Sequence, residues 1–85
     1  MKKLSTILHE FKRDFSSPPY AESLDVRAAE MERAAMAAGY IEDCAERNEV
    51  IKLAKSLSFQ FSFNTRVQNA FTLTLAFQRG AACEA

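Results

Sequence analysis

Apolar residues near the start of the chain recur at the spacing of an α-helix. They fall on one stripe of a helix whose other positions are mostly charged or polar: Leu4, Ile7, Leu8, Phe11 and Phe15. The pattern predicts an amphipathic helix that packs on a core. It should end near Phe15, because residues before proline are pushed out of the helical region and Ser16-Ser17-Pro18-Pro19 follows.

A second helix is predicted to run to about Ala38, with Ser17 or Ser23 as its N-terminal cap. Small and apolar residues repeat there at alternating spacings of three and four: Ala21, Leu24, Ala28, Met31, Ala35 and Ala38. This is a heptad seam, but it is too short for a free-standing coiled coil, so its partner should be a helix of the same chain. Gly39 suits the left-handed position that ends a helix.

Residues 40–57 are helical by propensity, but their apolar stripe changes direction. Ile41, Cys44 and Ala45 would cluster on one side, whereas Val50, Leu53 and Leu57 would lie nearly opposite. Either the helix is buried on two sides or it breaks near Asn48, which could cap a fresh helix. We favour a kink or break.

Between Ser56 and Gln78 the apolar residues alternate with neutral polar ones, which is the period of a β-strand. One set is Leu57, Phe59, Phe61 and Phe63, and the other is Phe71, Leu73, Leu75 and Phe77. The pattern predicts an antiparallel β-hairpin connected by Asn64 to Asn69, a loop without the Asn-Gly pair of a tight turn.

A helical alternative exists for the last of these residues. Asn64 could cap a helix that ends at Arg79-Gly80 and places five residues on one face: Val67, Ala70, Phe71, Thr74 and Phe77. The preferred fold class is therefore α+β, with two to four helices followed by a C-terminal antiparallel β-hairpin, and the alternative is a small all-α helical bundle. Residues 1–80 should form a single domain with one modest core, and residues 81–85 a frayed tail.

The formal net charge is zero but is unevenly spread. Residues 1–15 carry +2, residues 16–49 carry −5 and residues 50–85 carry +3. An acidic middle between basic ends suits head-to-tail or pairwise association.

The sequence offers few groups for catalysis or metal binding. The two cysteines, Cys44 and Cys83, form no CxxC pair and suit reduced thiols in the cytoplasm. His9 is the only histidine, and the two glycines form no phosphate loop. No stretch is long enough to span a membrane. We therefore expect no enzymatic activity, no metal, no cofactor and no membrane partner.

These observations predict a small regulatory protein, inhibitor or adaptor that binds a protein partner. The uncharged ribbon should pair two copies into a homodimer. The expected contact residues are Gln60, Ser62, Arg66, Thr72 and Thr74 of the ribbon, with Glu42, Asp43 and Glu46 of the acidic middle setting partner choice.

The alternative function is a nucleic-acid-binding transcriptional regulator. A short helix-turn-helix-like spacing occurs around Gly39, but acids dominate the helix that would read DNA. A second route is a basic surface with nearby aromatic residues that could stack on bases: Lys2, Lys3, Lys12, Arg13, Lys52, Lys55 and Arg66.

Overall fold

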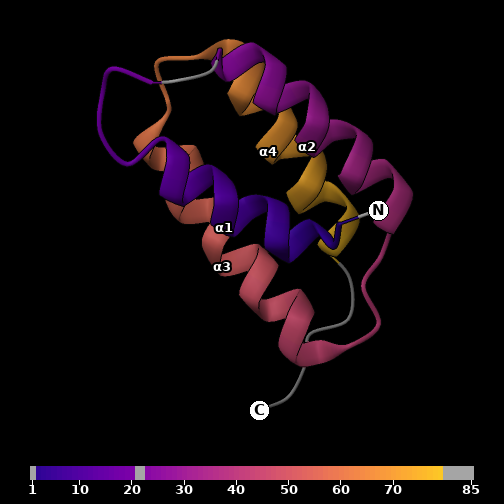
Figure 1. The fold of residues 1–85 in the computed structure, drawn as a ribbon. Helices are drawn as coiled ribbons and strands as arrows, with labels where there is room; N and C mark the ends of the chain where they lie inside the picture. Colours follow the sequence, from indigo (N-terminus) through magenta and orange to yellow (C-terminus); the bar gives the residue numbers. More distant parts are fainter. Residues whose placement is uncertain (1, 21–22, 80–85) are drawn as a thin grey trace.

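The computed structural model describes residues 2–20 and 23–79, and these form a bundle of four α-helices. The helices are α1 (Leu4–Asp14), α2 (Leu24–Ala38), α3 (Cys44–Gln60) and α4 (Thr65–Gln78). Around the bundle, α1 contacts α2 and α3, and α4 contacts the same two helices. Figure 1 shows that α1 and α3 run in one direction and α2 and α4 in the other. The helices that contact each other are therefore not all consecutive in sequence.

The predicted β-hairpin is wrong, since the described residues contain no strand. Ser56 to Gln60 complete α3, and Thr65 to Gln78 form α4, so the all-α alternative describes the fold. Burial in α4 follows the helical period rather than alternation, with Val67, Ala70, Phe71, Thr74 and Gln78 in the interior. The all-α alternative placed five residues on the buried face of this helix. Four of them are fully buried, and the fifth, Phe77, is half-buried.

Local hydrogen bonds explain why α4 is a helix despite its alternating residues. The Asn64 side chain accepts from the Val67 amide at 2.9 Å and so caps the N-terminus. The Thr74 hydroxyl donates to the Ala70 carbonyl at 2.9 Å, which satisfies a buried polar side chain within the helix itself. The side-chain nitrogen of Gln68 donates to the backbone carbonyls of Ser58 and Phe61, at 2.6 and 3.1 Å, and so links the end of α3 to α4.

Side-chain caps also set the starts of α2 and α3. Ser23 accepts from the Asp25 amide at 3.2 Å, so it is the later of the two predicted caps that begins α2. Asp43 accepts from the Ala45 amide at 3.0 Å and begins α3. The predicted break near Asn48 is wrong, because α3 is continuous across it. Ile41 precedes the helix, so its side chain does not belong to the stripe of α3.

Aromatic rings fill the core where α1 ends and the α3–α4 turn begins. The Phe11 ring is fully buried, and its centroid lies 4.7 Å from that of Phe15, 5.1 Å from Phe61 and 5.6 Å from Phe71. Tyr20 extends the cluster, 5.0 Å from Phe15. These rings come from α1, from the loop after it, from the α3–α4 turn and from α4. They therefore join segments that are far apart in sequence.

The opposite end of the bundle is held by polar side chains. Gln78 of α4 is 2% exposed; its amide nitrogen donates to the Gly39 carbonyl at 2.7 Å, and its oxygen accepts from the Ile41 amide at 3.0 Å. Arg47 is 5% exposed and donates to the Ile41 carbonyl at 3.2 Å and to the Tyr40 hydroxyl. Its guanidinium also lies 4.5 Å from the centroid of the Tyr40 ring. These contacts fix the α2–α3 loop.

An ionic contact joins the end of α1 to α2. The Asp14 carboxylate accepts from Arg13 Nε at 2.8 Å and lies 3.0 Å from Arg27 Nη1. The hydrogen bond from Arg13, with help from Arg27, lowers the pKa of the Asp14 carboxyl below its ordinary value.

The cysteine prediction does not hold at Cys44, which is disulfide-bonded. The sequence contains one other cysteine, Cys83, which lies outside the described residues, as does the predicted frayed tail at 81–85. The argument from reduced thiols to a cytoplasmic location is therefore lost.

Candidate protein-binding surface

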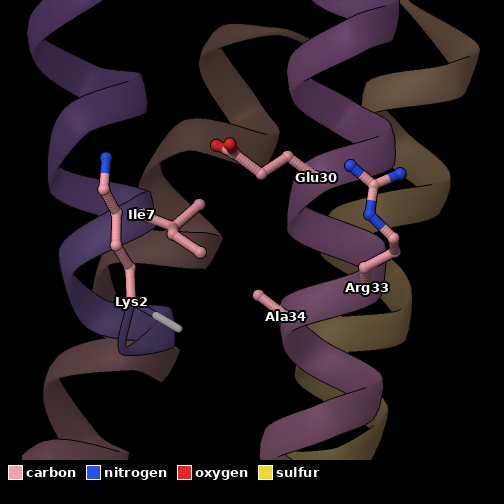
Figure 2. A pocket seen from close by; sticks show the side chains of 5 residues that line it. All are labelled: Lys2, Ile7, Glu30, Arg33 and Ala34. Atoms are coloured by element: carbon pink, nitrogen blue, oxygen red, sulfur yellow. The ribbon is translucent and has the colours of Figure 1, made fainter.

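A depression of about 300 Å³ lies between α1 and α2, but its residues do not suit chemistry. Figure 2 shows Ile7 and Ala34 pointing into the gap, with the Glu30 carboxylate reaching across from α2. Two of the charged residues at its rim already have partners, because Lys2 pairs with Glu10 at 2.9 Å and Glu30 with Arg27 at 3.6 Å. None of the lining residues is a serine, threonine, cysteine or histidine.

A second groove, of about 240 Å³, lies between α1 and α3 on another face of the bundle. It is lined by His9, Lys12, Glu49, Lys52, Leu53 and Ser56. His9 Nε2 lies 2.5 Å from Glu49 Oε1 and bridges the two helices across the groove. The lining contains two lysines, Lys12 and Lys52, against the single acid Glu49, so the groove carries a net positive charge.

The outer face of α3 continues this basic character. At about 100° per residue, Lys52, Lys55 and Phe59 lie on the side opposite the buried Val50, Ala54 and Leu57. Within the described ranges 2–20 and 23–79, no carboxylate is within ion-pair distance of Lys12, Lys52 or Lys55. The sequence itself has no acidic residue between Glu49 and Glu84.

Two phenylalanines stand out from the surface where α3 ends. Phe59 is 86% exposed and Phe63 is 70% exposed, whereas Phe61 between them is 1% exposed. The Phe63 ring centroid lies 5.8 Å from that of Phe61, so Phe63 rests against the edge of the core. We call Phe59 and Phe63, with the exposed Gln60 and Ser62 between them, the aromatic surface. Two such rings in water are typical of a contact with another molecule.

The structure separates the predicted contact residues of the former ribbon. Gln60 and Ser62 are exposed beside Phe59 and Phe63, and Thr72 is exposed on α4. Arg66 is exposed in the first turn of α4 and lies 3.8 Å from Glu32 of α2. Thr74 is fully buried and faces the core, so it is not part of any surface.

The acidic contact residues lie at the opposite end of α3. Glu42 and Asp43 are exposed in the loop before α3, and Glu46 is half-buried in its first turn. Asp43 is occupied as the cap of the helix. The 17 residues of α3 therefore stand between this group and the aromatic surface.

Sequence reasoning missed the exposure of Phe59 and Phe63. It placed both on the apolar face of a strand, beside Leu57 and Phe61. A signal existed, because Val50, Ala54, Leu57 and Phe61 recur at spacings of four, three and four, and this helical stripe leaves Phe59 on the opposite side. The buried Gln78 and Arg47 were also missed, and both bind backbone of the α2–α3 loop.

In the part of the chain that the structure describes, no group of three or more histidine, cysteine, aspartate or glutamate residues could hold a metal ion. No helix there is both long and apolar enough to cross a membrane. The chain matches no family model, no curated protein and no solved structure.

Proposed function

We propose that this protein is a small non-enzymatic regulator, inhibitor or adaptor that binds a protein partner through Phe59 and Phe63. The exposure of these two rings carries the proposal. Each phenylalanine that moves from water into an interface contributes roughly 1.5–3 kcal/mol, and aromatic residues are common among the few that dominate binding energy. The polar Gln60 and Ser62 beside them suit the rim of such an interface.

The partner in this proposal is a different protein rather than a second copy. The homodimer prediction relied on the edge of a β-ribbon, and residues 56–78 form helices instead. The predicted cytoplasmic location loses its support from reduced thiols, because Cys44 is disulfide-bonded.

Photo-crosslinking tests the proposal directly. p-Benzoylphenylalanine would replace Phe63 in the full chain, and the cells that naturally make the protein would be irradiated. We expect a covalent adduct with a protein, and we expect Phe59→Ser to remove it. The matched control carries the crosslinker at the exposed Ala76 of α4. Equal adducts at both positions would show that the aromatic surface is not a binding surface.

Phe59→Ser must leave the fold intact for this test to be informative. Substitution of an exposed side chain changes the free energy of unfolding by at most about 0.5 kcal/mol. Circular dichroism during urea unfolding should therefore give the same midpoint for the variant and the natural protein.

A second candidate function is nucleic-acid binding, which one observation favours. Lys52, Lys55 and Phe59 share one face of α3, and a base can stack on an exposed ring while lysines contact phosphates. Retention of a single-stranded oligonucleotide at low ionic strength, lost in Phe59→Ser, would support it. No retention at micromolar protein concentration would remove it.

A further inference from the structure

The α1/α3 groove and the aromatic surface lie along the same helix. The groove is lined by Lys12 and Lys52, with Leu53 as its apolar residue, and Lys55 and Phe59 follow on the outer face of α3. A bound molecule that matched both the lysines and the apolar residues of this face would carry negative charges and apolar side chains. We propose that the groove binds an acidic segment of the protein partner, with its apolar residues meeting Leu53 and Phe59. The inference rests on the proposed function and specifies the chemistry of its partner.

Charge complementarity selects this occupant. The three lysines lack a carboxylate within ion-pair distance among residues 2–20 and 23–79, and the only acid lining the groove, Glu49, is engaged by His9. Carboxylates of a partner would restore neutrality and steer its approach. A basic segment would meet like charges on both walls of the groove.

The same features fit a protein segment better than a nucleic acid. Nucleic-acid affinity grows with the number of phosphates that Lys and Arg neutralise, and this face offers three lysines in a chain of zero net charge. Leu53 in the groove suits an aliphatic side chain rather than a sugar-phosphate backbone. A second copy is also disfavoured, because Asp43, one of its exposed acids in the loop before α3, is occupied as the cap of that helix.

The test places the crosslinker inside the groove. Ser56 lines it and is exposed, so p-benzoylphenylalanine would replace Ser56 in the full chain, with Thr72 of α4 as the matched control position. After irradiation in the natural cells, the attached molecule would be identified by mass spectrometry. We expect a protein adduct at Ser56 whose attached peptide is rich in Asp and Glu, and no comparable adduct at Thr72.

Charge reversal then separates electrostatic recognition from simple proximity. Lys52→Glu with Lys55→Glu should lower the adduct yield at Ser56 about tenfold. Lys2→Glu with Lys3→Glu makes the same change in net charge at the N-terminus of α1, and should change the yield less than about twofold. Equal losses in both double variants would overturn the inference, since they would report overall charge rather than the groove.

The remaining outcomes are also decisive. Four kinds of adduct at Ser56 would contradict the inference that the groove binds an acidic protein segment. These are a nuclease-sensitive adduct, a lipid adduct, an adduct with a second copy, and an adduct with a neutral or basic peptide. A protein adduct at Phe63 with none at Ser56 would overturn the inference and leave the proposed function standing. If neither Ser56 nor Phe63 gives a specific adduct, the inference and the proposed function are both wrong.

Discussion

The two ends of the bundle are held together by different forces. Where α1 ends and α3 turns into α4, the contacts are between rings: Phe11, Phe15, Tyr20, Phe61 and Phe71. Around the α2–α3 loop, the contacts are hydrogen bonds from Gln78 and Arg47 to backbone carbonyls and amides. The aromatic end uses non-directional burial and leaves two further phenylalanines in water. The polar end uses directional bonds, which leave no buried side-chain nitrogen or oxygen without a partner in the described residues.

The difference between the two ends indicates which of them can carry an exposed binding surface without loss of stability. Burial of apolar area is additive and tolerant of geometry, so the aromatic end can hold its core with Phe61 while Phe59 and Phe63 stay outside. The stability of the α2–α3 loop depends on each of its hydrogen bonds, and the side chains that make them, Gln78 and Arg47, are not available to a partner. The exposed rings therefore lie at the end whose stability does not require them.

The largest effect is expected from Phe11→Ala. Phe11 is fully buried and contacts three other rings, so its removal should lower the free energy of unfolding by about 3–5 kcal/mol. Phe59→Ala removes the same atoms from an exposed position and should cost at most about 0.5 kcal/mol. Urea unfolding of both variants checks the difference. Similar costs for the two would show that the core is not centred on Phe11.

Gln78→Ala probes the polar end and should have the next largest effect. It leaves the Gly39 carbonyl and the Ile41 amide without the side chain that bonds them, at a cost of about 1–3 kcal/mol. Hydrogen exchange should locate the loss, with the Ile41 amide exchanging faster than in the natural protein while the amides of α1 keep their protection. Uniform acceleration throughout the helices would instead mean that the two ends unfold as one unit.

Asn64→Ala should have the smallest effect of the three. The Asn64 side chain caps α4 through the Val67 amide, and loss of such a cap costs about 1 kcal/mol. Asn64→Asp keeps an acceptor at the same position and serves as the control, with stability close to that of the natural protein. Unfolding midpoints by circular dichroism provide the measurement. Equal midpoints for the alanine variant and the natural protein would place the start of α4 elsewhere.

The sequence could predict the first half of the fold from particular residues. The stripe from Leu4 to Phe15 fits a helix only, and four of its five members lie within α1. The end of α2 was also predictable, since Gly39 has φ of +57° after the helix. These positions carry signals that tertiary contacts do not override.

Residues 56–78 could not be settled in the same way. Their alternation fits a strand, and the stripe of Val67, Ala70, Phe71 and Thr74 fits a helix equally well. The Asn64 cap and the packing of α4 against α2 and α3 decide for the helix. The candidate site suffered from the same ambiguity. A strand places Phe59, Phe61 and Phe63 on one face, and only a helix that ends at Gln60 buries Phe61 alone.

The order of the helices around the bundle has a consequence for how the chain folds. Two of the four interfaces, α1 with α3 and α2 with α4, join helices that have another helix between them in sequence. Such contacts raise the contact order above that of a bundle made of successive hairpins, and they slow folding. During synthesis the N-terminal helices emerge first, and α4 supplies the Phe71 ring that closes over Phe11. A nascent chain that has not yet extended through α4 thus carries an unfinished core, and a chaperone that shields apolar surface could act at this stage of its synthesis.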